Sequence, residues 1–281
     1  LLFRDRQETQ TALQIPAVLP VVEFVMAPAR TDTEQQTLMI DALPLLFEGG
    51  ISNYLRPLVQ AILKCADPGL RTELLFRLSI HRMRDQLYKR YISENASQKV
   101  SCRTTHLPDR LLNIIWRRGR CLPGSPLNRR DVIFIASTEM VPRRDPCRVG
   151  WILYDLTPMR IPKFFDPMPR RYRDHMKALA RRTDFIVTIS RNSKQDIVDL
   201  LHYPEDRVFV IYPGATPSKE PGPAHPVSGR RPYVYYMGSL ALNKNVDGML
   251  RIFSECVHRY GLDFDLVLTG KDFCGRDFWE R

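Results

Sequence analysis

The sequence lacks several patterns by which common protein classes are recognised. Its six cysteines form no Cys-x-x-Cys pair and have no histidine at metal-ligand spacing, which excludes a zinc site or disulfide framework of the usual kind. The longest uncharged run, Thr9 to Val22, is broken by Pro16 and Pro20 and is too short to cross a membrane. No stretch has the basic, apolar and small-residue order of a signal peptide. We therefore expect a cytoplasmic globular protein.

Acidic residues are scarce relative to basic ones, since 31 Asp and Glu stand against 42 Lys and Arg, giving a net charge of +11. The basic side chains gather in two groups: Arg110, Arg117, Arg118, Arg120, Arg129 and Arg130, then Arg160, Lys163, Arg170, Arg171, Arg173, Lys177, Arg181 and Arg182. This balance suits an anionic partner such as a phosphorylated substrate or phospholipid headgroups, although solvated helix faces would also explain it.

No nucleic-acid-binding module accompanies the charge, so we do not expect a nucleic-acid partner. The segment from Leu111 to Arg120 combines an apolar, Trp-containing face with arginines. That composition fits a helix lying on an anionic membrane surface. A cytoplasmic protein with peripheral attachment to the inner membrane face is therefore expected, and the same holds for the basic helix predicted at 169–182.

Strand and helix patterns alternate along most of the chain, after an N-terminal extension or linker at 1–36. Near-continuous apolar strands between amphipathic helices predict parallel sheets covered on both faces, an α/β fold. Strands are expected at 37–43, 72–78, 131–137, 148–156, 185–190, 208–212, 233–239 and 264–270. Helices are expected at about 51–62, 82–92, around Leu111, 169–182, 191–201 and 246–260, with a polar loop between the second and third.

Pro57 lies inside the first of these helices and predicts a late start or a kink there. Ser190 precedes the helix at 191–201 and is a good N-cap. Six prolines and three glycines between Pro213 and Pro232 indicate a linker. We therefore expect one doubly wound domain at 37–212 and the start of a second at 233–281. A doubly wound domain usually needs about 100–150 residues, so the second is expected to be incomplete.

The second domain opens with a strand that ends at Gly238, followed by a loop carrying Lys244 and by a helix that Asn245 begins. A glycine lets backbone approach a ligand, a helix N-terminus carries partial positive charge, and a lysine adds a full charge. A diphosphate would be well stabilised there. An ordinary βα turn with a solvated lysine is the alternative.

The preceding segment from Asp184 to Thr216 makes the pattern more specific. Together with the segments at 43–63 and 152–165 and the one running on to Lys271, it resembles a family 4 (group 1) glycosyltransferase of the GT-B fold. The resemblance covers roughly Thr37 to the end, in the family's order. It implies two Rossmann-like domains and transfer of a sugar, for example a hexose such as mannose, from a nucleotide sugar to a glycan or lipid-linked acceptor in polysaccharide or lipopolysaccharide assembly. No cofactor is expected, because the nucleotide sugar is a substrate.

The resemblance also implies site residues. Gly49 and Gly50 match the family's glycine pair, which closes over the donor diphosphate and acceptor. Gly238, Ser239 and Lys244 match the second domain's diphosphate site. Tyr154 and Asp155 match the acceptor side, with Asp155 as the catalytic candidate and a helix-capping role as its alternative. The cleft is expected between Gly50, Asp155 and Lys244.

Several features depart from the family pattern. Ser239 stands where many members have an arginine, Thr216 stands where an acidic residue often follows the hinge glycine, and the Glu-x7-Glu segment is missing. No Asp-x-Asp motif ends a strand, which is consistent with metal-independent transfer, and the resemblance implies a retaining transferase. A non-catalytic truncated module that binds an anionic surface, or another GT-B enzyme such as a sugar-nucleotide epimerase or a phosphorylase, remain the alternatives. The epimerases lack a Tyr-Asp-Leu-x-Pro segment, and phosphorylases are much longer.

Overall fold

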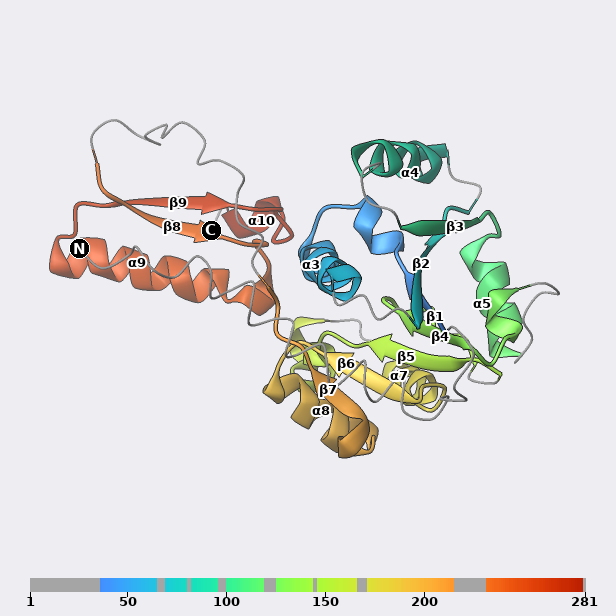
Figure 1. Cartoon of the computed structure of the whole chain (residues 1–281). Coiled ribbons are helices and arrows are strands. Elements are labelled where there is room, and N and C mark those ends of the chain that lie inside the picture. Colours follow the sequence, from blue (N-terminus) through green and yellow to red (C-terminus); the bar gives the residue numbers. More distant parts are fainter. Residues whose placement is uncertain are drawn as a thin grey trace. The chain divides into compact units, whose positions relative to one another are not determined.

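The computed structural model describes residues 36–64, 69–79, 82–95, 100–118, 125–143, 146–165, 171–214 and 231–279. The described residues fall into two compact units, the first within Leu1–Met159 and Pro169–Thr216 and the second within Arg160–Met168 and Pro217–Arg281. Each unit has its own sheet (Figure 1). The predicted extension, except Gln36, and most of the predicted linker at 213–232 lie outside the described residues.

The first unit contains a seven-stranded sheet in the order β3-β2-β1-β4-β5-β6-β7, and every neighbouring pair is parallel. Its strands are β1 (Gln36–Asp41), β2 (Leu70–Arg77), β3 (Ser101–Thr105), β4 (Val132–Ala136), β5 (Arg148–Ile152), β6 (Phe185–Thr188) and β7 (Val208–Val210). This is an α/β fold with the strand order of a Rossmann-like domain. The expected parallel α/β architecture of this part is thus confirmed.

Between residues 36 and 207, six α-helices and four short 3₁₀ helices are described. They are α3 (Gly50–Lys64), α4 (Arg82–Glu94), α5 (Asp109–Arg117), α6 (Thr157–Arg160), α7 (Tyr172–Ala180) and α8 (Arg191–Leu201). The 3₁₀ helices are η1 (Leu43–Leu46), η2 (Pro126–Asn128), η3 (Pro162–Phe164) and η4 (Glu205–Arg207). Helix α3 begins at Gly50 and continues through Pro57, so the expected late start is wrong.

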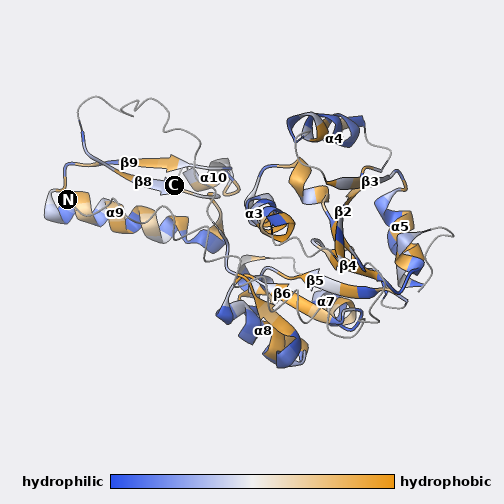
Figure 2. Cartoon of the chain, in the orientation of Figure 1, coloured by the Kyte–Doolittle hydropathy of each residue, from blue (hydrophilic) through white to orange (hydrophobic). Residues whose placement is uncertain are grey.

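Alternate residues of the strands belong to two separate hydrophobic cores, one on each face of the sheet. On one face, Leu38 and Ile40 of β1 pack with the apolar stripe of α3, and α4 adds partly buried aromatic side chains. On the other face, Met39 packs with residues of α5, α7 and α8. Figure 2 shows the resulting orange stripes of α3 and α8 beside blue solvent-facing residues. Burying both faces explains why the strands read as continuous apolar runs.

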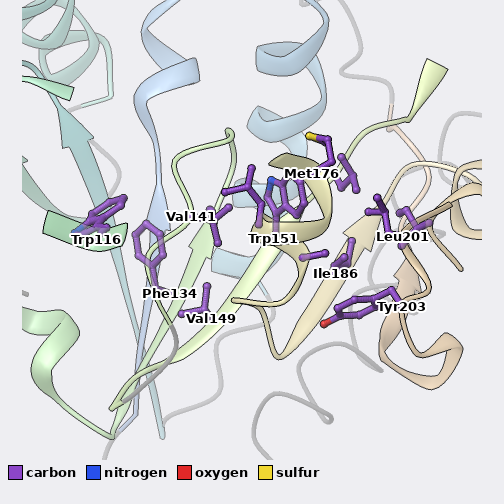
Figure 3. Packing of buried hydrophobic residues seen from close by; sticks show 14 of the residues in the cluster. Trp116, Phe134, Val141, Val149, Trp151, Met176, Ile186, Leu201 and Tyr203 are labelled. Carbon is purple, nitrogen blue, oxygen red and sulfur yellow. The ribbon is translucent and has the colours of Figure 1, made fainter. Parts of the chain in front are cut away.

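The second core contains two buried tryptophans (Figure 3). Trp151 of β5 is 1% exposed, and Trp116 of α5 is 4% exposed with its ring centroid 5.8 Å from that of Phe134. The prediction that the Trp-containing face of this helix meets a membrane is therefore wrong, because that face supplies the core. The exposed apolar side chains of α5 are Leu111 and Ile114 instead.

Two further expectations for this unit are corrected. The segment predicted as a polar loop contains β3, which forms the edge of the sheet beside β2. Its sequence Ser-Cys-Arg-Thr-Thr has no alternating apolar pattern, because an edge strand covered on one side buries little. The strand expected at 148–156 ends at Ile152, so Tyr154 and Asp155 lie in the loop that follows β5.

The second unit contains a two-stranded parallel sheet of β8 (Tyr233–Met237) and β9 (Asp265–Thr269). Its other described elements are the 3₁₀ helices η3 and η5 (Leu242–Lys244), helix α9 (Val246–Tyr260) and helix α10 (Arg276–Trp279). Gly261 has φ 63° and ends α9, where Gly261 and Leu262 donate to the carbonyls of Val257 and Cys256. Most of β8 is exposed, although the apolar strand pattern of the chain predicts sheets covered on both faces.

None of the described helices is both long and apolar enough to cross a membrane. Cys102, Cys147, Cys256 and Cys274 are free thiols, and of these Cys147 is fully buried. The other three are partly exposed. Cys65 and Cys121 lie outside the described residues.

Candidate functional site

The order in which the chain adds strands to the first sheet reverses between β1 and β4. These two strands are neighbours in space although β2 and β3 separate them in sequence. In open parallel α/β sheets, ligands bind outside the carboxyl ends of the strands at such a switch point. The loops that follow β1, β4 and β5 therefore define the candidate site of this unit. Gly49, Gly50, Tyr154 and Asp155 all lie on these loops.

Gly49 and Gly50 join the loop after η1 to helix α3. Gly49 has φ 147°, a value that residues with a side chain rarely adopt. The first bond of the helix runs from Asn53 N to Gly49 O (2.9 Å), so the N–H groups of Gly50, Ile51 and Ser52 precede the helical ladder. A Cβ at either glycine would meet no atom within 4 Å. Open space and unused donors at a helix start are what an anionic group requires.

Tyr54, one turn into α3, connects this loop to the segment after β5. Its ring meets Tyr154 edge-on with centroids 5.5 Å apart, and its hydroxyl donates to Ile211 O (3.0 Å). The Tyr154 hydroxyl donates to Ser137 O (3.4 Å), after β4. Burial raises the pKa of both tyrosines well above the ordinary value, and Tyr54 and Asp41 raise that of Tyr154 further. Both side chains are thus neutral and brace the three loops against one another.

Asp155 is exposed and caps the short helix α6, because its Oδ1 accepts a hydrogen bond from Thr157 N (2.9 Å). The capping role considered from the sequence is therefore present. The other carboxylate oxygen makes no protein hydrogen bond among the described residues. Capping and ligand contact are compatible, so the catalytic assignment of Asp155 stays a prediction.

Sequence reasoning missed a buried ion-pair network at the same edge. Arg77, at the end of β2, donates to both carboxylate oxygens of Asp41, at the end of β1 (3.2 and 3.1 Å), and to Asp109 (2.7 Å). Thr138 after β4 bonds the same carboxylate (3.0 Å), and Arg84 donates to Asp109 (2.9 Å). Burial alone would lower the pKa of Arg77, but the two carboxylates raise it above the ordinary value.

This network fixes the ends of β1, β2 and β4, which carry the candidate loops. Asp41 is 0% and Arg77 1% exposed, so neither side chain is open to a ligand. We infer a positioning role. The sequence signal was a single charge at the end of each apolar strand, in Met-Ile-Asp and Leu-Phe-Arg.

A second missed group lies around the loops after β4 and β5. Glu139 pairs with His175 of α7 (3.3 Å), and both side chains are partly exposed. Burial raises the pKa of Tyr172, and the carboxylates of Glu139 and Asp155 raise it further. Carboxylates accept hydrogen bonds and a phenol donates one, and a polyhydroxylated ligand needs both kinds of partner.

In the second unit, the loops after β8 and β9 run side by side. Gly238 N donates to Thr269 O (3.0 Å) and Leu240 N to Lys271 O (2.9 Å). A Cβ at Gly270, whose φ is 143°, would lie 1.8 Å from the carbonyl oxygen of Gly238. Gly270 therefore permits the close approach of the two loops, a role that the sequence did not suggest. Gly238 itself has φ 157°.

Ser239 and Lys244 follow this contact. The Ser239 carbonyl accepts a hydrogen bond from the Tyr236 hydroxyl (3.0 Å). Lys244 ends η5 with an exposed side chain that forms no ion pair within the described part of the chain. Asn245 adopts the left-handed conformation (φ 53°) and begins α9 without a side-chain cap. The expected order of strand, glycine, loop lysine and helix is confirmed.

The structure thus brings Gly49, Gly50, Tyr154 and Asp155 to one edge of the first unit, and Gly238, Ser239 and Lys244 to one edge of the second. A cleft between the two groups stays a prediction. Among the described residues, no group of three His, Cys, Asp or Glu side chains is arranged to hold a metal ion. A scan against models of protein families gives no match, and a search of curated proteins finds no relative.

Proposed function

We propose that this chain is a nucleotide-sugar-dependent glycosyltransferase of the GT-B type. The observation that carries the proposal is the glycine pair ahead of α3, at the switch point of a parallel sheet. Gly49 has a backbone conformation suited to glycine, and a Cβ at Gly50 would meet no atom within 4 Å. The N–H groups of Gly50, Ile51 and Ser52 donate to no carbonyl within the described part of the chain. Such a helix start stabilises a diphosphate. The matching Gly238, Lys244 and helix α9 of the second unit support the same chemistry.

In this proposal the described residues have distinct tasks. The N–H groups at the start of α3 and the Lys244 ammonium stabilise the charge that develops on the departing nucleoside diphosphate. Asp155 and Glu139 accept hydrogen bonds from acceptor hydroxyls and orient one of them towards the anomeric carbon. The bond from that carbon to the diphosphate oxygen breaks, the bond to the acceptor oxygen forms, and the proton of the acceptor hydroxyl passes to the departing diphosphate. Retention of configuration, independence of metal, and a glycan or lipid-linked acceptor follow from the sequence resemblance.

The proposal is tested by nucleotide-sugar binding. Calorimetric titration with UDP-, GDP- and ADP-hexoses should identify at least one donor, and its nucleoside diphosphate should be released with an acceptor extract. Gly50→Ala should weaken donor binding at least tenfold without loss of stability, because its methyl group meets no protein atom but covers the N–H groups.

Asn53→Ala is the matched control, since Asn53 is an exposed neighbour in the same helix turn and keeps its backbone N–H. If the Gly50 variant binds the donor as tightly as the unaltered chain, the diphosphate does not bind at this helix start. Conversion of the donor to another sugar nucleotide without net diphosphate release would indicate an epimerase. Failure of every donor to bind would overturn the proposal in favour of a non-catalytic module.

A further inference from the structure

The first unit contains a cavity at the amino ends of its strands, opposite the carboxyl ends that carry the candidate site. It has a volume of about 520 Å³ and is bordered by the end of α7 and by the segment that joins α8 to β7. Helix α7 ends at Ala180 before β6 begins at Phe185, and α8 ends at Leu201 before β7 begins at Val208. Both borders are therefore at the amino ends of the strands. We call this cavity the α7–α8 pocket.

Two buried residues with hydroxyl groups, Thr183 and Tyr203, line the pocket. Thr183 is 3% and Tyr203 8% exposed. The Tyr203 hydroxyl donates to Thr183 O (3.2 Å), and the Thr183 hydroxyl lies 3.1 Å from Tyr203 Oη and 2.7 Å from Ala180 O. His202, between Leu201 and Tyr203, adopts the left-handed conformation with φ 55° and fixes the sharp turn at the end of α8. These bonds hold the wall residues in place.

The rim of the pocket is basic. Lys177, Arg181, His202 and Arg207 line it, and no carboxylate is among its described lining residues. The neighbouring Glu205 pairs instead with Lys194 (3.7 Å), and Arg182 points elsewhere, since it donates to Val141 O (3.4 Å). Asp206, beside Arg207 on η4, does not line the pocket.

The basic side chains of the unit differ from one another in whether they pair with a carboxylate. Arg71, Arg84 and Arg103 each contact a carboxylate. Lys177, Arg181 and Arg207 form no ion pair within the described part of the chain. Three cations around one cavity repel one another, and an anion between them would relieve that repulsion.

We propose that the α7–α8 pocket binds a phosphate group, carried by a small soluble ligand or by a lipid headgroup. Guanidinium groups donate to phosphate oxygens in a planar fork, and lysine adds a mobile charge. The volume lies within the range of small-ligand sites, about 300–1,000 Å³. Its place at the amino edge of the sheet separates this site from the diphosphate site proposed at the carboxyl edge.

The experiment compares the chain with the double variant Arg181→Gln/Arg207→Gln. Inorganic phosphate and glycerol 3-phosphate are titrated by phosphorus NMR, and vesicles of phosphatidylcholine with 20% phosphatidic acid are tested by flotation, at constant ionic strength. The double variant should weaken binding at least tenfold, because it removes two charge-assisted contacts. Arg173→Gln is the control, since Arg173 is exposed on α7 and does not line the pocket.

If the double variant loses binding of inorganic phosphate and glycerol 3-phosphate but still binds the vesicles, the ligand is a small soluble phosphate. If it loses only vesicle binding, the ligand is a lipid headgroup. Absence of binding to all three probes, or equal binding by the double variant, would overturn the proposal. Gly50→Ala, which tests the diphosphate site, should leave phosphate binding unchanged, so failure of either site is distinguishable from failure of the other.

Discussion

The guanidinium of Arg77 and the carboxylate of Asp41 form a two-pronged ion pair inside the first unit, with neither side chain open to solvent. Removing one partner leaves a buried, unpaired charge, which typically costs about 3–5 kcal/mol. Arg77→Ala should therefore lower the free energy of unfolding by about that amount in urea denaturation. Arg90→Ala, which breaks an exposed pair with Glu94, should leave the free energy of unfolding nearly unchanged. Equal effects would show that Arg77 is not held as described.

Alkaline pH should destabilise the first unit through Tyr54 and Tyr154. Burial raises the pKa of both in the folded protein, whereas tyrosine in an unfolded chain ionises near pH 10. Above about pH 10 the unfolded state therefore binds fewer protons than the folded state. The contribution of the two neutral tyrosines to the free energy of unfolding is complete below that pH and declines as pH rises above it. Tyr154→Phe should reduce that decline by up to about 1.4 kcal/mol per pH unit.

Urea unfolding at pH 8 and pH 11 measures this difference. Tyr212→Phe, at a tyrosine that is 53% exposed, is the matched control and should leave the slope unchanged. A Tyr154 variant with the slope of the unaltered chain would contradict the buried, neutral state of this phenol.

Gly270→Ala should separate the loops after β8 and β9. Its Cβ would overlap the carbonyl oxygen of Gly238, and the positive φ adds strain of about 1–3 kcal/mol. The amides of Leu240 and Phe273, which bond across these loops, should lose protection from hydrogen exchange. Gly275→Ala has a positive φ but open space, so it tests strain without the overlap. If both variants behave alike, the close approach is not the cause.

Lys244→Ala tests the charge assigned to the leaving group. If the proposed function holds, loss of this preorganised charge should raise the barrier to transfer by about 2.7–4 kcal/mol, a 100- to 1,000-fold fall in kcat. Stability should change by less than about 0.5 kcal/mol because the side chain is exposed. Arg251→Ala, an exposed cation on α9, is the control. Near-normal turnover of this variant with a verified donor would show that Lys244 is only a solvated loop residue.

Helix α5 should associate weakly with anionic membranes through the exposed face of Arg110, Leu111, Ile114 and Arg118. Attraction of this kind fades as the screening length falls to about 8 Å at physiological salt. Leu111→Ser/Ile114→Ser should reduce vesicle binding at low salt. Val234→Ser, at an exposed apolar residue of the second unit, is the control. Equal binding to neutral and anionic vesicles would count against the prediction.

Local patterns were sufficient for much of the fold. The bounds of α8 were predicted to the residue, because Ser190 caps the helix by accepting a bond from Ser193 N (3.0 Å) and the apolar stripe ends at Leu201. The bounds of α9 were equally clear, since Gly261 ends it in the left-handed conformation. Apolar runs predicted six of the seven strands of the first sheet, and β3 was missed because its residues at the sheet edge are polar.

The site was predicted less completely, since pairing across the fold has no local signature. Asp41 and Arg77 are 36 positions apart and meet because their strands are neighbours. The sequence around Gly270 indicates only an ordinary turn, and the need for glycine there is evident only from its close approach to Gly238 in the structure. In the same way, Trp116 belongs to an amphipathic pattern that suits a membrane or a core equally well, and packing against Phe134 decides for the core.

The central position of β1 has a consequence for biosynthesis. One edge of β1 pairs with β2, which follows soon after, but the other pairs with β4, which begins at Val132. Until that segment leaves the ribosome, a nascent β1–β2 pair presents a row of unpaired amide and carbonyl groups beside apolar side chains, a template for association with other chains. Slowed translation between β2 and β4 should therefore lower the yield of native protein, and a chaperone that shields strand edges should restore it.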